Sequence, residues 1–150
     1  MSWHLDSSAE EAFRLLMDYL KQKGVVVVRS DSPSYIRGVF GSWSQLVLDN
    51  AKGVVKVTVD EEEDGGCSVG LGLSFLSEFF VALVLTIVVG VLTYFVYGRL
   101  DFSSMWTWVV ILVEVVVIWG IVGFSVPLTR RKFMKEFGVF MQSLSAKKQE

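Results

Sequence analysis

The sequence is short of the residues that form disulfides and metal sites. Its 150 residues include one Cys, Cys67, and one His, His4. A single Cys excludes an internal disulfide and fits a reducing compartment. Neither residue has a second Cys or His at metal-ligand spacing. We therefore expect structural roles for both, and the sequence predicts no metal site and no cofactor.

Patterns that would indicate an enzyme are also lacking. A Cys–His nucleophile pair is not expected, and the glycines after the run Asp60–Asp64 do not have the spacing of a phosphate loop. The acidic run itself could attract a divalent cation, but it lacks the spaced oxygen ligands of an EF-hand loop. We interpret it as a solvated turn, and we expect no catalytic residues and no enzymatic activity.

Two long uncharged or nearly uncharged runs dominate the middle of the chain. Phe79–Tyr97 has nineteen residues without a charge, and Met105–Phe124 has twenty residues with one charge, Glu114. At about 1.5 Å per residue, nineteen helical residues reach about 28 Å, close to a hydrocarbon core of about 30 Å. Buried strands are much shorter, about 4–8 residues. The sequence predicts two transmembrane helices within residues 77–126.

Glu114 does not exclude the second span. A charged residue at mid-helix costs about 2.5–3.5 kcal/mol on the insertion scale, whereas each Val, Ile or Leu contributes about −0.3 to −0.6 kcal/mol. The segment has eleven of these aliphatic residues. Their sum equals or exceeds the penalty, so insertion is favoured.

Basic residues near the spans predict the orientation. The connecting loop, Gly98–Ser104, holds only Arg99, while the tail holds Arg130, Arg131, Lys132 and Lys135. The positive-inside rule places the tail in the cytoplasm, and a hairpin returns residues 1–76 to the same side. The first twenty residues also lack the basic start and apolar run of a secretory signal. We expect a multi-pass protein of the cell membrane with both termini cytoplasmic.

Residues 1–76 are predicted to form a cytoplasmic α+β domain. A short strand at Trp3–Leu5 precedes a helix at Ala9–Lys23, whose start has Ser followed three residues later by Glu. Apolar residues then alternate at period two, which indicates an antiparallel meander with one apolar face. The expected strands are Val25–Arg29, Tyr35–Phe40, a weaker Gln45–Leu48, Val54–Asp60 and Cys67–Phe75.

The tail, residues 127–150, is predicted to be a separate amphipathic helix that begins at Pro127, a residue suited to a first helical turn. Its apolar stripe consists of Phe133, Phe137, Phe140, Met141 and Leu144. The helix either lies on the membrane surface or closes over the sheet. We favour the sheet, because one helix does not cover it. The basic residues Arg130, Arg131, Lys132 and Lys135 are expected to contact anionic lipid headgroups.

The order strand, helix, meander and final helix resembles the START-like (helix-grip) superfamily, interrupted by a membrane hairpin before the last helix. The resemblance covers residues 1–76 and 127–146 and lies in the order of elements. It implies an apolar ligand enclosed between sheet and final helix. The chain also resembles small uncharacterised prokaryotic membrane proteins.

A carboxylate inside a membrane span indicates a functional site by default. Thr86, Gly90 and Thr93 share a stripe of the first span, and folding the hairpin about Asp101 brings Glu114 to the depth of Val88. Gly90 would then permit close approach, and Thr86 could hydrogen-bond the carboxyl group. The alternative is an uncharged Glu114 that is satisfied inside the hairpin or at an oligomer interface.

Two functions remain open from the sequence. The first is a membrane-tethered binding or interaction module that recognises a lipid, an apolar ligand or a protein. The second is a subunit of an oligomeric complex or pore, a homo-oligomer included, with Glu114 in the assembly. Nucleic acid is not an expected partner, because residues 1–76 hold seven basic and eleven acidic residues.

Overall fold

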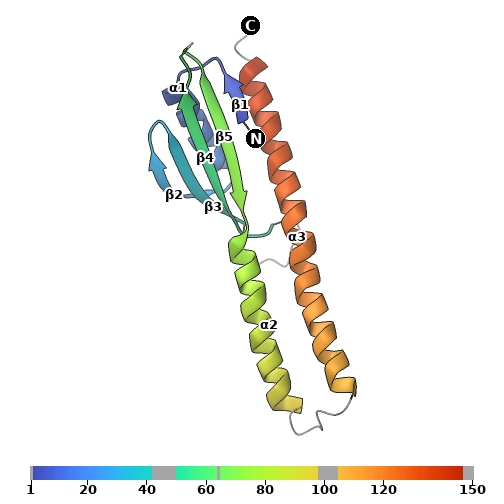
Figure 1. Ribbon diagram of the computed structural model, residues 1–150. Coiled ribbons are helices and arrows are strands. Elements are labelled where there is room, and N and C mark those ends of the chain that lie inside the picture. The colour runs from blue at the N-terminus through green and yellow to red at the C-terminus, as the bar shows by residue number, and fades with distance from the viewer. Residues whose placement is uncertain (1, 42–49, 64, 98–104, 147–150) are drawn as a thin grey trace.

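The computed structural model describes residues 2–41, 50–63, 65–97 and 105–146 (Figure 1). Its elements are β1 (Ser2–Leu5), α1 (Ala9–Gln22), β2 (Val26–Asp31), β3 (Tyr35–Phe40), β4 (Gly53–Glu61), β5 (Cys67–Ser74), α2 (Leu76–Tyr97) and α3 (Met105–Ala146). The strands form one antiparallel sheet in the order β1–β5–β4–β3–β2. The α+β class and the meander are confirmed. The strand candidate Gln45–Leu48 and the loop Gly98–Ser104 lie outside the described residues.

Helix α1 begins and ends close to the predicted positions. The backbone N–H of Glu11 donates to the Ser8 hydroxyl at 3.4 Å, which caps the first turn. Beyond the last residue, Gln22, Gly24 adopts φ +73°, a left-handed conformation that glycine adopts without strain. The N–H of Val25 then donates to the Leu20 carbonyl at 2.9 Å and closes the helix end.

The sheet has one apolar inner face and one polar outer face. In β4, Val55, Val57 and Val59 are buried while the residues between them are exposed. Helix α1 packs on the inner face, with Leu16 and Leu20 fully buried. This alternation is the period-two pattern of the sequence, since successive side chains of a strand point to opposite faces.

The C-terminal half of α3 completes the same core. Phe137 and Met141 belong to one hydrophobic cluster with buried residues of α1 and of the inner face of the sheet. Phe137 contacts the rings of Trp3 and Tyr19 edge to face, with centroids 5.1 and 5.9 Å apart. The amphipathic stripe therefore packs against the sheet and α1. Residues separated by the whole hairpin share one core.

Helix α3 is one helix of 42 residues, and the separate tail helix expected from Pro127 is a wrong prediction. Pro127 lies inside the helix, where its ring removes one backbone hydrogen bond. Hydroxyl groups on both sides of it bond to helix carbonyls: Ser125 to Val122 at 3.5 Å and Thr129 to Ser125 at 2.8 Å. Such side-chain bonds allow proline within apolar helices, and the packing of the second half holds the helix in line.

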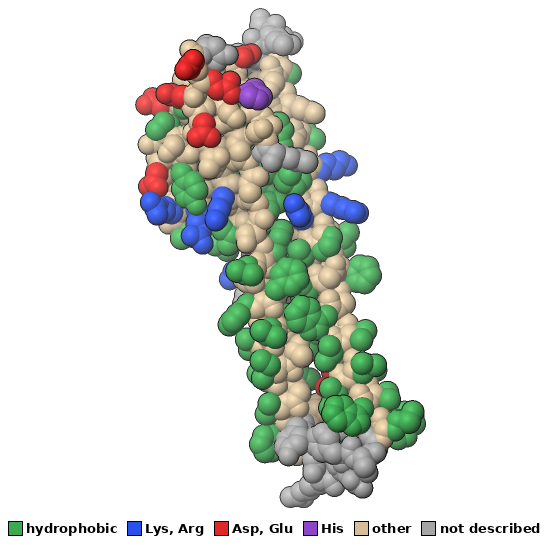
Figure 2. Space-filling view, in the orientation of Figure 1, with side chains coloured by type: hydrophobic (Ala, Val, Ile, Leu, Met, Phe, Trp, Pro, Cys, Tyr) green, Lys and Arg blue, Asp and Glu red, His purple; other side chains and the backbone are tan. Residues whose placement is uncertain are grey.

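The hairpin of α2 and the first half of α3 leaves most of its apolar side chains uncovered. Both helices are long and apolar enough to cross a membrane, and only 11% of each apolar stretch is buried inside the protein. Examples are Leu92 at 57% exposure and Val116 at 62%. The core helix of a water-soluble protein would instead be mostly buried. Figure 2 shows hydrophobic side chains along the whole length of both helices.

Candidate binding groove and its surroundings

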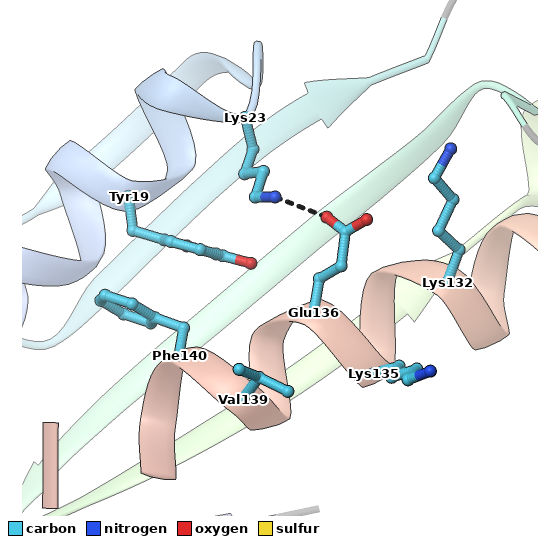
Figure 3. Close-up of a pocket in the computed structure, with 7 residues that line it drawn as sticks. All are labelled: Tyr19, Lys23, Lys132, Lys135, Glu136, Val139 and Phe140. Carbon is cyan, nitrogen blue, oxygen red and sulfur yellow. Dashed lines mark hydrogen bonds and ion pairs between the residues drawn. The ribbon is translucent and has the colours of Figure 1, made fainter. Parts of the chain in front are cut away.

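A groove lies between the end of α1 and the second half of α3 (Figure 3). It has a volume of about 530 Å³. Its floor is the pair Tyr19 and Phe140, whose rings stack with centroids 4.0 Å apart. The side chains that line it are Tyr19, Lys23, Lys132, Lys135, Glu136, Val139 and Phe140. Aromatic and aliphatic surface is thus combined with four charged groups.

The groove carries more positive than negative charges. Lys23 lies at the end of α1 and its Nζ donates to the Glu136 carboxylate at 2.6 Å (Figure 3). With Lys132 and Lys135, the lining carries three positive charges and one negative charge. Such a surface favours an anion that brings more than one oxygen acceptor.

Tyr19 presents a neutral hydroxyl group to the groove. Burial, and then the nearby Glu136 carboxylate, raise the pKa of Tyr19 to about 12. Both effects disfavour the negatively charged phenolate. Tyr19 therefore keeps its proton at any physiological pH and can act as a hydrogen-bond donor.

A second, smaller hollow adjoins the groove on the side of the hairpin. Its volume is about 170 Å³, and it shares Lys23, Lys132 and Glu136 with the groove. The other lining residues are Phe40, Gly41, Asn50, Thr129 and Phe133. The two hollows therefore run along α3 in succession, from Thr129 to Phe140.

The four basic tail residues are divided between two faces of α3. Lys132 and Lys135 line the groove, whereas Arg130 and Arg131 line a separate hollow of about 400 Å³ with Val126, Pro127 and Met134. From the sequence alone, the four residues were interpreted as one basic cluster. Arg131 and Lys132, which are neighbours in the sequence, are turned by about 100° from each other on the helix.

A further basic surface crosses the outer face of the sheet. Arg29, Arg37 and Lys56 are successive partners across β2, β3 and β4. Like charges directly opposite each other destabilise a sheet. Only Arg29 has a carboxylate partner among the described residues, Asp31 at 3.0 Å. Lys56 lies two residues after Val54, and Val54 pairs with Ser74 at the end of β5. The row is therefore in the half of the sheet that adjoins α2.

Charge is separated along the domain. The first turn of α1 is acidic and its last turn holds Lys21, and β4 ends at Glu61, the end of the sheet opposite α2. In Figure 2 the Lys and Arg side chains gather near the two long helices, while most Asp and Glu side chains lie toward the other end. The domain therefore presents a positive end toward the hairpin.

Hydrogen bonds fasten the domain to both long helices at their junction. The backbone N–H of Lys52 donates to the Glu78 carboxylate in the first turn of α2. One residue earlier, the N–H of Ala51 donates to the buried Thr129 hydroxyl of α3 at 2.9 Å. Ser77 adds a bond to the Lys52 carbonyl at 3.4 Å. The two residues before β4 thus tie α2 and α3 together.

Within the hairpin, Glu114 contacts Thr93, and the expected contact with Thr86 is wrong. The Thr93 hydroxyl lies 3.1 and 3.0 Å from the two carboxyl oxygens, while Thr86 donates to the Ala82 carbonyl of its own helix at 2.7 Å. The helices are therefore shifted by five residues, about 7.5 Å, from a hairpin folded about Asp101. Glu114 lies opposite a residue near the end of α2.

Gly90 does not allow the close helix contact that the sequence suggested. A Cβ atom added there would meet open space within 4 Å. Nearer the domain, Ala82 of α2 and Val122 of α3 are both buried.

The other candidates take structural positions. Cys67 is buried in β5, and His4 Nδ1 lies 2.7 Å from a Glu62 oxygen at the surface. The described part of the chain contains no group of three His, Cys, Asp or Glu side chains that could hold a metal.

Tyr19, Lys23 and Glu136 were missed as groove residues by sequence reasoning. Lys23 and Glu136 are 113 residues apart, and no local pattern links them. The one usable signal was the aromatic stripe of the tail, which indicated that this helix would pack on the domain.

No family model, curated protein or solved structure matches this chain. The functional argument therefore rests on the geometry.

Proposed function

We propose that this chain is a two-pass protein of the cell membrane, whose cytoplasmic α+β domain is a binding module held at the membrane surface and not an enzyme. The hairpin, residues 77–126, would anchor it, and the domain would be built from residues 1–76 and 127–150. The observation that carries the proposal is the positive end of the domain, which lies where two uncovered apolar helices leave it.

The exposure of the hairpin supports insertion in a bilayer. Exposed apolar patches on soluble proteins rarely exceed a few hundred Å², whereas here almost every large apolar side chain of two long helices is exposed. Lipid would cover this surface. The helices also satisfy their own backbone hydrogen bonds, as a hydrocarbon environment requires.

The separation of charge supports the orientation. Cytoplasmic leaflets attract basic segments by about 1 kcal/mol for each Lys or Arg near the surface. Three basic surfaces face the membrane side: the groove, the Arg130–Arg131 hollow and the sheet row of Arg29, Arg37 and Lys56. The acidic end would point away from the leaflet. This arrangement extends the positive-inside argument from the tail to the whole domain.

The junction supports a fixed position of the domain. Helix α3 continues from the hairpin into the core without a linker, and Lys52 and Ala51 bond to α2 and α3 respectively. The groove would therefore stay at a constant height above the bilayer and a constant angle to it.

The START-like layout is consistent with this module in the order of its elements. Between sheet and last helix, Leu16, Ile36 and Phe137 are fully buried in one cluster. The hollows named above open at the surface. Ligand binding is therefore assigned to the groove outside the core.

An oligomeric complex is the second candidate. The uncovered faces of the hairpin favour it, since other helices as well as lipid would cover them. The contact between Glu114 and Thr93 weakens it, because the carboxyl group already has a partner inside the hairpin. Native mass measurement in mild detergent separates the two: a monomer supports the module, and a defined oligomer that Glu114→Gln dissociates supports the complex.

Labelling of single cysteines tests the orientation. In a Cys67→Ser background, a membrane-impermeant maleimide should label Ser103→Cys in intact cells. Ser145→Cys, on the exposed end of α3, should react only after permeabilisation. Labelling of Ser145→Cys in intact cells would place the domain outside and contradict the proposal.

A further inference from the structure

The two contiguous hollows along α3 span the height at which lipid headgroups meet the cytoplasm. Phe124 is the last residue of the apolar run, and Thr129 lies five residues later, about 7.5 Å along the helix. Phe140 lies sixteen residues later, about 24 Å. A bilayer has about 5–8 Å of polar layer on each side of its hydrocarbon core. The lower hollow would therefore begin at the outer edge of the headgroup layer, and the groove would extend farther out. Lys132 lies eight residues beyond Phe124, about 12 Å along the helix, and its long side chain can reach back to the phosphate level.

The positive charges lie where the two hollows meet. Lys23 and Lys132 line both of them, on either side of Glu136 (Figure 3). A phosphate group at this point would accept hydrogen bonds from two ammonium groups that come from different helices. Charge-assisted hydrogen bonds of this kind are the strong ones. Its negative charge would complement the excess positive charge of the lining.

We propose that these two hollows form one binding site for an anionic phospholipid of the adjoining leaflet, with its phosphate between Lys23 and Lys132. The proposal rests on the proposed function, which places the positive end of the domain at this leaflet. The outer part of the headgroup would lie on the stacked rings of Tyr19 and Phe140. The glycerol end would face the lower hollow, beside Phe40 and Phe133.

The lining of the lower hollow favours a membrane lipid over a free phosphate ion. Phe133 is partly exposed and provides apolar surface on the side nearest the hairpin, and its ring stacks on the buried Phe40 with centroids 4.8 Å apart. A small inorganic anion makes no use of this surface, whereas the glycerol and the first acyl carbons of a lipid would bury part of it. The groove volume also lies within the usual range for ligand sites, about 300–1,000 Å³.

Glu136 would weaken the binding of the lipid. Its carboxylate holds Lys23 and repels a phosphate, so binding requires Lys23 to be shared. The Tyr19 hydroxyl, which keeps its proton, would supply a further donor. Removal of Glu136 and removal of Tyr19 are therefore expected to have opposite effects on the same ligand.

The test uses the full chain in nanodiscs, which expose both leaflets. Discs of phosphatidylcholine alone are compared with an equimolar mixture of phosphatidylcholine and phosphatidylglycerol. Native mass spectrometry after release counts the phosphatidylglycerol molecules that stay bound. A third arm adds inorganic phosphate to phosphatidylcholine discs. The variants are Lys132→Gln/Lys135→Gln, Tyr19→Phe and Glu136→Gln.

The matched control is Arg14→Gln/Lys21→Gln. It removes the same charge from α1, where both side chains are exposed and lie outside the three basic surfaces that face the membrane. At about fivefold for each charge, we expect the groove double variant to lower phosphatidylglycerol retention by about 25-fold and the control by twofold or less. Tyr19→Phe should lower it by about tenfold, and Glu136→Gln should raise it.

Equal losses in the groove and control variants would overturn the proposal, because the lipid would then respond only to overall charge. Retention of inorganic phosphate with no preference for phosphatidylglycerol would overturn it as well. Both readouts are independent of orientation in cells. A domain found outside the cell would overturn the proposed function, while the nanodisc result would still report on the site itself.

Discussion

The two halves of α3 belong to one helix but are built for different surroundings. In the first half, large apolar side chains are exposed on the sides that do not pack on α2, as for Val117 at 53% and Phe124 at 70%. In the second half, Phe137 and Met141 are buried and the exposed positions include the four basic residues. A helix that is apolar all round belongs in lipid or a core, whereas a one-sided stripe belongs at a protein surface.

The comparison bears on the proposal that a small domain is coupled rigidly to a membrane. No linker separates the two environments, because the helix passes from one to the other at Pro127. The change is one of side-chain pattern and not of backbone structure. Four substitutions or conditions test this contrast, from the largest expected effect to the smallest.

Truncation of a buried ring in the second half should have the largest effect. Phe137→Ala removes a fully buried side chain and should destabilise the domain by about 3–5 kcal/mol. Hydrogen–deuterium exchange of the β4 and β5 amides in nanodiscs would measure it. Phe124→Ala, the control in the first half, should leave this exchange nearly unchanged. Equal effects would remove the distinction between the halves.

High pH should weaken the contact of α1 with the second half. The pKa of Tyr19 is raised from 10.0 to about 12 in the folded domain. Between these values the unfolded chain loses the proton and the folded chain keeps it, so stability is complete below pH 10 and falls as the pH rises toward 12. The loss from Tyr19 should be about 2–3 kcal/mol.

Comparison with Tyr19→Phe isolates this loss from the titration of lysines. Urea unfolding at several pH values would measure both proteins. The wild-type curve should fall more steeply than that of the variant in this interval. Parallel curves would show that Tyr19 has the same pKa in the folded and unfolded states.

Replacement of Pro127 tests whether the halves are one helix. If α3 is continuous, Pro127→Ala adds a backbone hydrogen bond and removes a ring that disfavours the helix interior. We expect a gain of about 1 kcal/mol, seen as a rise of about 2–4 °C in the midpoint of thermal unfolding. A proline at the start of a separate helix would predict no gain, or a loss.

The smallest effect is expected in the first half. Thr93→Val removes the hydroxyl that bonds Glu114 and should weaken the hairpin by about 0.6 kcal/mol, the mean for such bonds in membranes. Thr86→Val is the matched control, since Thr86 bonds only to its own helix. Unfolding of the hairpin in mixed detergents would compare them, and equal values would contradict the Thr93–Glu114 contact.

The sequence predicted the strands and helices well where pattern and environment agree. The alternation of Val55, Val57 and Val59 located β4 and its buried face, and the Ser8 cap located the start of α1. These signals are local, because each depends on residues a few positions apart.

Features that depend on distant contacts were not predictable in the same way. Local rules for proline favoured a new helix at Pro127, but packing of Phe137 against Trp3 and Tyr19 holds the helix in line. Which residue of α2 lies opposite Glu114 depends on how the two helices are joined and packed, and the hydropathy of the sequence does not determine this. The groove needs Lys23 and Glu136 from opposite ends of the chain, and only the folded domain brings them together.

The most direct test of the central claim is a scan of accessibility along α3. In a Cys67→Ser background, single spin labels at successive positions of Met105–Ala146 would report contact with lipid, water or protein in nanodiscs. The account predicts lipid contact at the exposed positions of the first half and water contact at the exposed positions beyond Pro127. The side that packs on α2 and then on the domain should be protected with a repeat of about 3.6 residues along the whole helix, with no break in the period at the proline. Water contact at the exposed positions of the first half, or a break in the period at Pro127, would contradict it.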